Sequence, residues 1–185
     1  MRPGTLLISQ PFLNDPNFER SVVLLCHDAP EDGTFGLVLN RLTNLTLGDV
    51  LDLPPEVGHA ATALPLYVGG PVEPNTLHYL HRRPDLPGAT ALGQDVYWGG
   101  DFELLLGLIG SGAVGADEVR LFAGYSGWSV GQLASEMQGQ SWIRHSASAG
   151  KVFTLASDAF WREILREKGG RFKVLANYPV DPRLN

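Results

Sequence analysis

The sequence has one cysteine, no long apolar run and fewer charged residues than most soluble proteins. Cys26 is the only cysteine among 185 residues, so no intrachain disulfide can form, which fits a reducing compartment. The N-terminal stretch holds only a short apolar run before polar residues and proline, and no later run is long enough to cross a bilayer. We therefore expect a cytoplasmic protein without membrane attachment.

Internal repeats, low-complexity tracts and Gly/Ser-rich linkers are also lacking. We therefore expect a single domain over residues 1–185. A chain of this length buries roughly 70% of its unfolded surface and needs no disulfide or metal to fold. Hydrophobic residues at 44% and charged residues at 18% describe a soluble globular protein.

Basic residues are scarce in most of the chain, and the net charge is −6. Residues 1–136 carry 6 basic and 16 acidic side chains, whereas residues 137–185 carry 8 and 4. The overall charge opposes binding to nucleic acid, because phosphate backbones attract basic surfaces. A solvated helix face explains the basic excess near the C-terminus more simply than a nucleic-acid contact does. Such a contact would use these residues: Arg144, Lys151, Arg162, Arg166, Arg171 and Lys173.

Short apolar runs bounded by turn residues predict strands in the first half of the chain. Asp32 and Gly33 separate two of these runs, so residues 21–27 and 35–40 are expected to pair as a hairpin. Thr46 is a candidate N-cap for one or two helical turns. "PLYVGGPV" predicts a strand ending in a glycine turn, with "TLHYLH" as its partner strand. "EVRLFAGY" predicts a later strand.

Three helices are expected in the second half. The first begins at Asp101, and the second begins at Ser129, where Gln132 can complete a capping box. The third covers residues 157–168 and ends at Gly169. Its buried face is predicted to contain Phe160, Trp161, Ile164 and Leu165. Short strands with scattered helices and no regular βαβ alternation predict an α+β fold.

Ser126, in "GYSGW", raises the question of a catalytic nucleophile. A nucleophile elbow needs Gly-x-Ser-x-Gly, but Trp128 stands where the second glycine belongs. His145 is the only histidine downstream, and no suitable aspartate precedes it. A glycine turn that joins a strand to a helix is the favoured interpretation, and no catalytic residue is assigned.

Three further patterns indicate structure rather than chemistry. "GSGAVG" at residues 110–115 follows a helix and precedes a strand, the reverse of a dinucleotide-binding loop. Neighbours on a strand point to opposite faces, so Cys26 and His27 cannot form a dyad. His78 and His81 also lie on opposite faces of a strand, and without further ligands they predict no metal site. No cofactor is expected.

Two polar or glycine-rich stretches are candidates for ligand binding. Asn40 and Arg41 follow a strand, and a guanidinium group suits a carboxylate or phosphate. Gly69, Gly70 and Pro71 form a turn where a ligand can approach the backbone closely. Taken singly, each stretch is explained more simply as a strand-end charge or a tight turn.

Several motifs together give the chain a recognisable pattern. "GTLLISQP", "DPNFERSVVLL", "GLVLNR", "YVGGPV" and "FAGYSGWSVGQLASEM" occur in this order and resemble the YqgE/AlgH family of bacterial proteins over almost the whole chain. The resemblance implies a single α+β domain with a barrel-like, mostly antiparallel sheet and helices packed outside it. The family's motif residues correspond here to Asp15, Phe18, Asn40, Arg41, Gly69, Gly70, Pro71, Tyr125, Gly127, Trp128, Gln132 and Trp142.

The resemblance supplies no established catalytic set, although one branch has a name that implies transcriptional regulation. We expect residues 124–127 to form a turn that positions Tyr125 and Trp128. We further expect a surface groove to which these residues contribute: Asn40, Arg41, Gly69, Gly70, Pro71, Trp128 and Gln132. The leading interpretation is a non-catalytic binding or regulatory protein that recognises a small anion or a protein segment. An enzyme acting on a small polar substrate at the same groove is the first alternative, and a nucleic-acid-binding regulator is the second.

Overall fold

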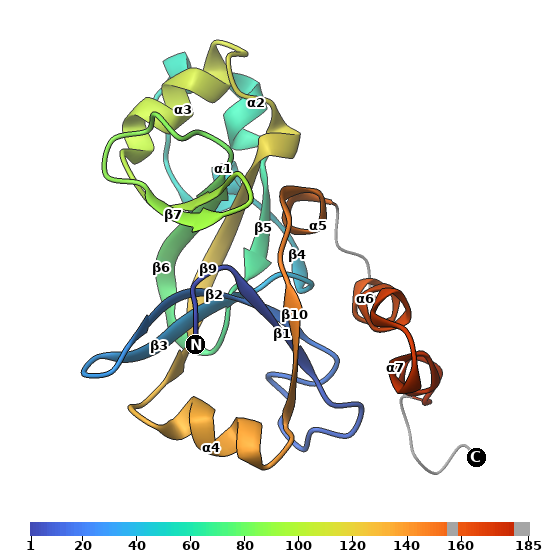
Figure 1. Ribbon diagram of the computed structural model, residues 1–185. Coiled ribbons are helices and arrows are strands. Elements are labelled where there is room, and N and C mark those ends of the chain that lie inside the picture. Colours follow the sequence, from blue (N-terminus) through green and yellow to red (C-terminus); the bar gives the residue numbers. More distant parts are fainter. Residues whose placement is uncertain (155–158, 180–185) are drawn as a thin grey trace.

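A computed structural model describes residues 1–154 and 159–179, and within them ten strands form one strongly curved, unclosed sheet (Figure 1). All paired strands are antiparallel except β5 and β9. The α+β class predicted from the sequence is confirmed, and barrel-like describes the curvature loosely. The strands are β1 (Thr5–Ser9), β2 (Val22–Ala29), β3 (Gly33–Val38), β4 (Leu42–Thr46), β5 (Pro65–Val68), β6 (Val72–His81), β7 (Thr90–Gly93), β8 (Val96–Trp98), β9 (Val119–Trp128) and β10 (Trp142–Ser146).

The helices surround this sheet in three groups. In Figure 1, α1 to α3 crown one end with β7, α4 lies at the opposite end, and α5 to α7 run along the side of β10. The helices are α1 (Leu47–Val50), α2 (Gly58–Thr62), α3 (Phe102–Gly110), α4 (Gln132–Gln138), α5 (Ala149–Phe153), α6 (Phe160–Lys168) and α7 (Arg171–Leu175), with short 3-10 turns η1 (Pro55–Val57) and η2 (Ala116–Glu118).

The main path of the sheet runs β10-β1-β2-β3-β9-β6-β8-β7. The predicted hairpin is confirmed, since β2 and β3 pair antiparallel. The predicted pairing of "PLYV" with "TLHYLH" is wrong, because β5 and β6 both pair with β9 instead of with each other. Their closeness in the sequence favoured a direct hairpin, but β9 is long enough to pair with both β5 and β6.

The expected turn at residues 124–127 is also wrong. These residues belong to β9, which continues to Trp128 and pairs there with β3. Gly124 has a φ of 65°, a conformation that few residues other than glycine adopt readily, and it bends the strand without ending it. The bend lets the first half of β9 pair with β5 while the second half pairs with β3.

The predicted helices form with two differences at their beginnings. Asp101 caps α3 as expected, with its carboxylate accepting from the Leu104 N–H at 2.9 Å. Helix α4 begins at Gln132 instead of Ser129, although the Gln132 side chain does accept from the Ser129 N–H at 2.9 Å. Helix α6 begins at Phe160, and the predicted start at Ser157 lies outside the described residues.

The larger core joins side chains of the sheet to side chains of α5 and α6. All four predicted side chains of the α6 face are buried. Trp161 is completely buried and donates from Nε1 to the Ser9 carbonyl at 2.9 Å. Arg120 is 4% exposed and lies over the Tyr67 ring, with its Cζ 4.0 Å from the ring centroid. Burial lowers the pKa of Arg120, and Tyr67 opposes that shift.

Candidate functional site

The two glycine motifs meet backbone to backbone. A Cβ on Gly69 would lie 2.3 Å from the Gly124 carbonyl oxygen, and one on Gly70 would lie 2.2 Å from the carbonyl oxygen of Tyr125. Both positions therefore exclude a side chain, and the Gly69 N–H donates to the Ala123 carbonyl. The sequence suggested that a ligand could approach the backbone of this turn, but the Gly69 N–H is not free to bind one, because it is already bonded.

Ser126 is completely buried and donates its hydroxyl proton to the Gly69 carbonyl at 3.0 Å. Its Oγ is therefore an internal link between the two glycine motifs and is closed to a substrate. Cys26 is also buried, and burial raises the pKa of its thiol far above the usual range. Neither group has the environment of an activated nucleophile.

Asn40 and Arg41 hold the loop that leads into β2. The Asn40 amide accepts from the Val22 N–H and donates to the Arg20 carbonyl, at 2.9 and 2.8 Å. One Arg41 nitrogen donates to the Pro16 and Glu19 carbonyls at 3.2 and 3.1 Å. These bonds give both side chains a structural task within the protein.

Trp128 and Gln132 belong to a network around Glu136 in α4. The Nε1 atoms of Trp128 and Trp142 both donate to Glu136 Oε2, at 2.9 and 2.7 Å. Gln132 donates to Glu136 Oε1 at 2.9 Å. The ring of Phe18 stacks on Trp128, with centroids 6.0 Å apart. Several family-motif residues thus meet at a carboxylate that the sequence analysis did not single out.

The seven predicted ligand-binding residues are thus divided between internal contacts and the surface. Gly69, Gly70 and Trp128 are buried, whereas Pro71 and Gln132 are exposed. Their role in ligand binding stays a prediction. A different region of the surface offers a better-formed site for an anion.

This region is a cleft of about 640 Å³ between the start of β1, the end of β10 and the β7–β8 turn. We call it the basic cleft. It is lined by Arg2, Pro3, Gly4, Thr5, Leu92, Gly93, Gln94, Arg144, His145, Ser146, Ala147 and Lys168. Three of these residues are permanently cationic at neutral pH and none is a carboxylate, in a protein of net charge −6. The cleft is therefore a positively charged region on the surface of an acidic protein.

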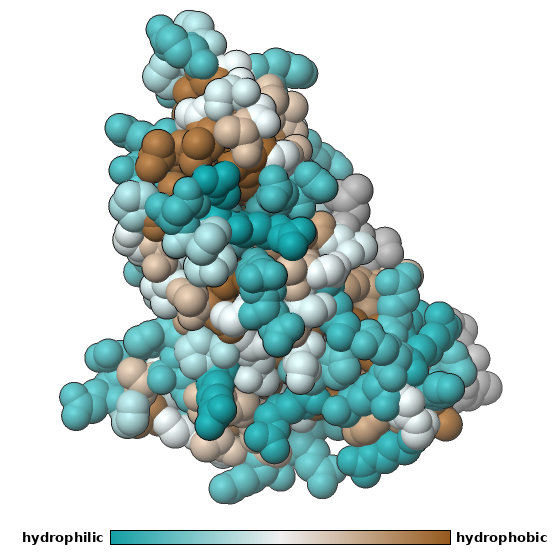
Figure 2. Space-filling view, turned by 45° about the horizontal axis from the view of Figure 1, so that its top comes forward, coloured by the Kyte–Doolittle hydropathy of each residue, from teal (hydrophilic) through white to brown (hydrophobic). Residues whose placement is uncertain are grey.

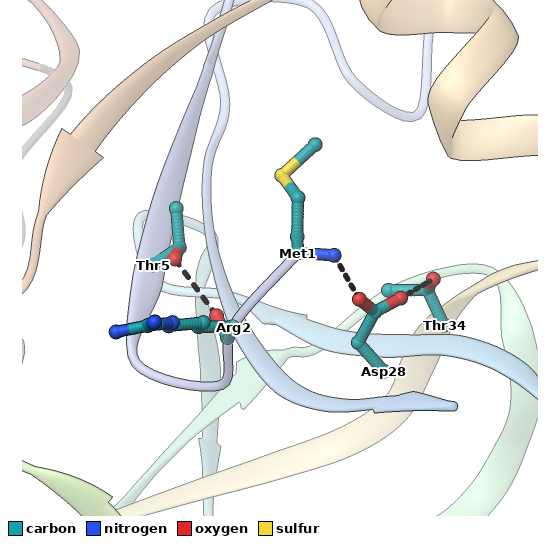
Figure 3. A network of polar contacts seen from close by, with 5 residues as sticks. All are labelled: Met1, Arg2, Thr5, Asp28 and Thr34. Atoms are coloured by element: carbon teal, nitrogen blue, oxygen red, sulfur yellow. Dashed lines mark hydrogen bonds and ion pairs between the residues drawn. The ribbon is translucent and has the colours of Figure 1, made fainter. Parts of the chain in front are cut away.

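The cations of the basic cleft are not neutralised by partners. Within the described residues, the guanidinium groups of Arg2 and Arg144 make no hydrogen bond or ion pair, and Lys168 donates to the Arg144 carbonyl at 2.7 Å. Figure 3 shows the Arg2 side chain pointing away from Asp28, whose carboxylate instead accepts from the Met1 amino group and the Thr34 hydroxyl. Among the described residues, both guanidinium groups are therefore available to bind an anion.

His145 adds a neutral wall to the basic cleft. Burial, reinforced by the positive charge of Lys151, lowers the pKa of its imidazole, although Glu167 opposes the shift. Its Nε2 is buried without a hydrogen-bond partner among residues 1–154 and 159–179, and the nearest Glu167 oxygen is 3.8 Å away. Glu167 is itself paired with Lys151 at 2.8 Å. The negative charge of Glu167, beside the cleft, is therefore largely neutralised.

A second cleft, of about 670 Å³, lies at α1 and α2 and has a different chemistry. Asp49 and Asp52 line it, and Val50 and Leu51 in its wall are exposed side chains. Figure 2 shows hydrophobic residues at the surface of the end of the molecule that carries these helices. Its acidic lining makes this cleft unsuitable for an anion.

The described part of the chain shows no cluster of three or more potential metal-ligating side chains. None of the helices in that part is long and apolar enough to cross a membrane. Of the basic-cleft cations, only Arg144 is a binding candidate from the sequence, through the basic excess of the C-terminal region. No sequence pattern points to Arg2, because the fold alone brings it to β10.

Comparison with known proteins places the chain among similar sequences and folds. A family model described as AlgH-like matches residues 6–173. A UPF0301 protein of Cytophaga hutchinsonii is 43% identical over 184 residues, covering 98% of both chains. A UPF0301 protein of Chlorobaculum tepidum is 39% identical over 186 residues, covering 100% of this chain and 96% of the relative.

Two solved structures share the fold. The solution structure of the AlgH protein from Pseudomonas aeruginosa matches with a TM-score of 0.74 at 26% identity, covering 96% of this chain and 94% of that one. A crystal structure of a Corynebacterium diphtheriae protein matches with a TM-score of 0.76 at 23% identity, covering 96% and 93%. The arrangement of strands and helices is therefore shared by both structures.

Proposed function

The chain belongs to the AlgH-like family, and from this premise we propose that it is a non-catalytic binding protein that holds a small anion in the basic cleft. The observation that carries the proposal is the pair of guanidinium groups, Arg2 and Arg144, which lie beside Lys168 and have no partner or lining carboxylate among the described residues. Guanidinium groups bind phosphate and carboxylate through paired N–H donors. The cytoplasmic location expected from the sequence remains part of this proposal.

The non-catalytic part of the proposal is supported by the state of the candidate nucleophiles. Ser126 and Cys26 are buried, and the Ser126 proton is already donated to Gly69. The basic cleft supplies positive charge, but the described part of its lining contains no carboxylate that could serve as a general base beside His145. Recognition of an anion needs only the charge.

The alternative of nucleic-acid binding through the C-terminal region has weaker support. Lys151 pairs with Glu167, and Arg162 donates to the Ala176 carbonyl at 3.0 Å. Arg171 lies over the ring of Phe172. The cations named for that role are thus partly used inside the protein, and the net charge of −6 still opposes a polyanion.

The test is a thermal-shift screen with inorganic phosphate, phosphorylated sugars and dicarboxylates. A ligand at a hundred times its Kd stabilises the folded state by about 2.7 kcal/mol, which raises Tm by several degrees in a domain of this size. We expect a shift in the wild type that the Arg2→Gln/Arg144→Gln variant loses. The shift should also weaken as salt rises.

A matched control is Arg82→Gln/Lys173→Gln, which removes the same charge from exposed positions outside the basic cleft. This control variant should keep the ligand-induced shift. Equal loss in both variants would show a general charge effect. No shift with any anion would contradict the proposed function.

A further inference from the structure

Four aromatic rings from four strands gather at one edge of the larger core. Phe35 of β3 is central, with its centroid 4.9 Å from Trp98 of β8 and 4.8 Å from Tyr125 of β9. His78 of β6 completes the group at 5.1 Å from Phe35. We call these four side chains the ring cluster. All four are only partly buried, so the cluster presents aromatic surface to solvent.

Two polar atoms of the ring cluster are unused. Among the described residues, neither the Trp98 indole N–H nor the Tyr125 hydroxyl has a hydrogen-bond partner, and neither atom is enclosed. The other three tryptophans differ, because Trp128, Trp142 and Trp161 all donate to acceptors inside the protein. The cluster therefore combines an aromatic surface with free donors at its edge, as a site for a flat polar ring requires.

The charge around the ring cluster also suits a neutral ring. His78 contacts the Thr76 hydroxyl through Nε2 at 3.1 Å, and burial lowers the pKa of its imidazole, with Glu73 opposing. At neutral pH the imidazole is therefore uncharged. Glu73 is the acidic group that acts on this histidine, and it disfavours an anion at the cluster itself.

The β7–β8 hairpin connects the ring cluster to the basic cleft. Gly93 and Gln94 line the cleft, and Gly93 pairs with Val96. Trp98 lies two residues further along β8, about 7 Å away at the usual rise of a strand. Leu92 and Val96 belong to the core cluster against which Trp98 packs. Both surfaces thus flank one short hairpin.

We propose that the ring cluster stacks the base of a nucleoside monophosphate whose phosphate lies in the basic cleft. This inference rests on the proposed function and names the class of anion. The observation behind it is that the β7–β8 hairpin borders both surfaces: it carries Trp98 of the ring cluster, and its turn lines the basic cleft that holds Arg2 and Arg144. Stacking on an aromatic side chain strengthens binding about tenfold or more for each base.

The experiment compares three probes by isothermal titration calorimetry: adenosine 5′-monophosphate, ribose 5-phosphate and adenosine. We expect adenosine 5′-monophosphate to bind at least about tenfold more tightly than ribose 5-phosphate. Trp98→Leu should remove this advantage and leave ribose 5-phosphate binding unchanged. Trp98→Phe keeps an aromatic face, so it should retain most of the advantage.

The outcomes separate this inference from the proposed function. Equal binding of ribose 5-phosphate and adenosine 5′-monophosphate would overturn the stacking site and leave the anion site standing. Binding of neither phosphate would overturn both. Tyr125→Leu provides a second variant if Trp98→Leu does not fold, and an unchanged base preference in both folded variants would also contradict the inference. Tighter binding of an oligonucleotide than of any mononucleotide would assign the surface to nucleic acid instead.

Discussion

The indole nitrogens of Trp128 and Trp142 donate to the same carboxylate oxygen of Glu136. The two rings lie edge to face with centroids 5.9 Å apart. Trp128 ends β9 and Trp142 begins β10, so Glu136 on the intervening α4 ties both strands to the helix. The aromatic pattern of the family motif thus has a structural role at this end of the fold.

Replacing Glu136 tests this link. Glu136→Ala leaves the indole donors of two buried tryptophans without an acceptor and should lower the free energy of unfolding by about 2–4 kcal/mol. Glu136→Gln keeps one oxygen acceptor and should cost clearly less. Urea denaturation of the two variants measures the difference. Equal losses smaller than about 0.5 kcal/mol would show that the indole bonds add nothing to stability.

Replacing Gly70 tests the contact between the glycine motifs. Gly70→Ala would bring a Cβ within 2.2 Å of the Tyr125 backbone, so the two segments must separate. We expect a loss above about 3 kcal/mol or failure to fold. Gly107→Ala is the matched control, because Gly107 lies inside α3 with open space around it. That change should stabilise the protein by about 0.5–1 kcal/mol.

The burial of His81 leads us to expect that the stability of the protein depends on pH. It is completely buried, accepts the Arg83 N–H at Nδ1 and bonds the Gly99 carbonyl through Nε2, so both nitrogens are satisfied in the neutral ring. Burial lowers its pKa, and the bond to Gly99 opposes the shift. Below about pH 6.5 this histidine therefore binds a proton more readily in the unfolded chain than in the folded protein. The free energy of unfolding falls as pH falls.

The size of this effect is measurable by urea denaturation between pH 7 and pH 5. One histidine contributes up to about 1.4 kcal/mol per pH unit in that window, and His78 and His145 act in the same direction. His81→Gln should reduce the slope of stability against pH, whatever its effect at pH 7. An unchanged slope would show that His81 takes up its proton in the folded state as readily as in the unfolded chain.

Local signals in the sequence predicted the elements that depend on local contacts. The Asp101 cap fixes the start of α3, and the apolar stripe with Gly169 fixes α6. The sequence predicts a shorter β9, because a glycine inside a strand weakens it and often marks a bend. Here Gly124 bends the strand, since Gly69 and Gly70 approach it from a distant segment. The sequence of β9 alone carries no signal of this contact with a distant segment.

The residues of the candidate sites were hard to predict for the same reason, because contacts between distant segments bring them together. Arg2 and Arg144 lie far apart in the sequence, and the pairing of β1 with β10 brings them together. No spacing rule links them. Asn40 and Arg41 illustrate the opposite case. Their side chains suggest ligand binding in the sequence, but in the structure they form hydrogen bonds that hold a loop.

The most direct test of the account is an NMR titration of the ¹⁵N-labelled protein with ribose 5-phosphate. Binding in the basic cleft predicts concentration-dependent shifts of the backbone amides of Gly4, Gly93 and Ala147, which line it. The Arg2→Gln/Arg144→Gln variant should lose these shifts. Shifts concentrated instead around Gly70 and Gln132, or no shifts at about 10 mM ligand, well above a millimolar Kd, would contradict the claim that this cleft is an anion site.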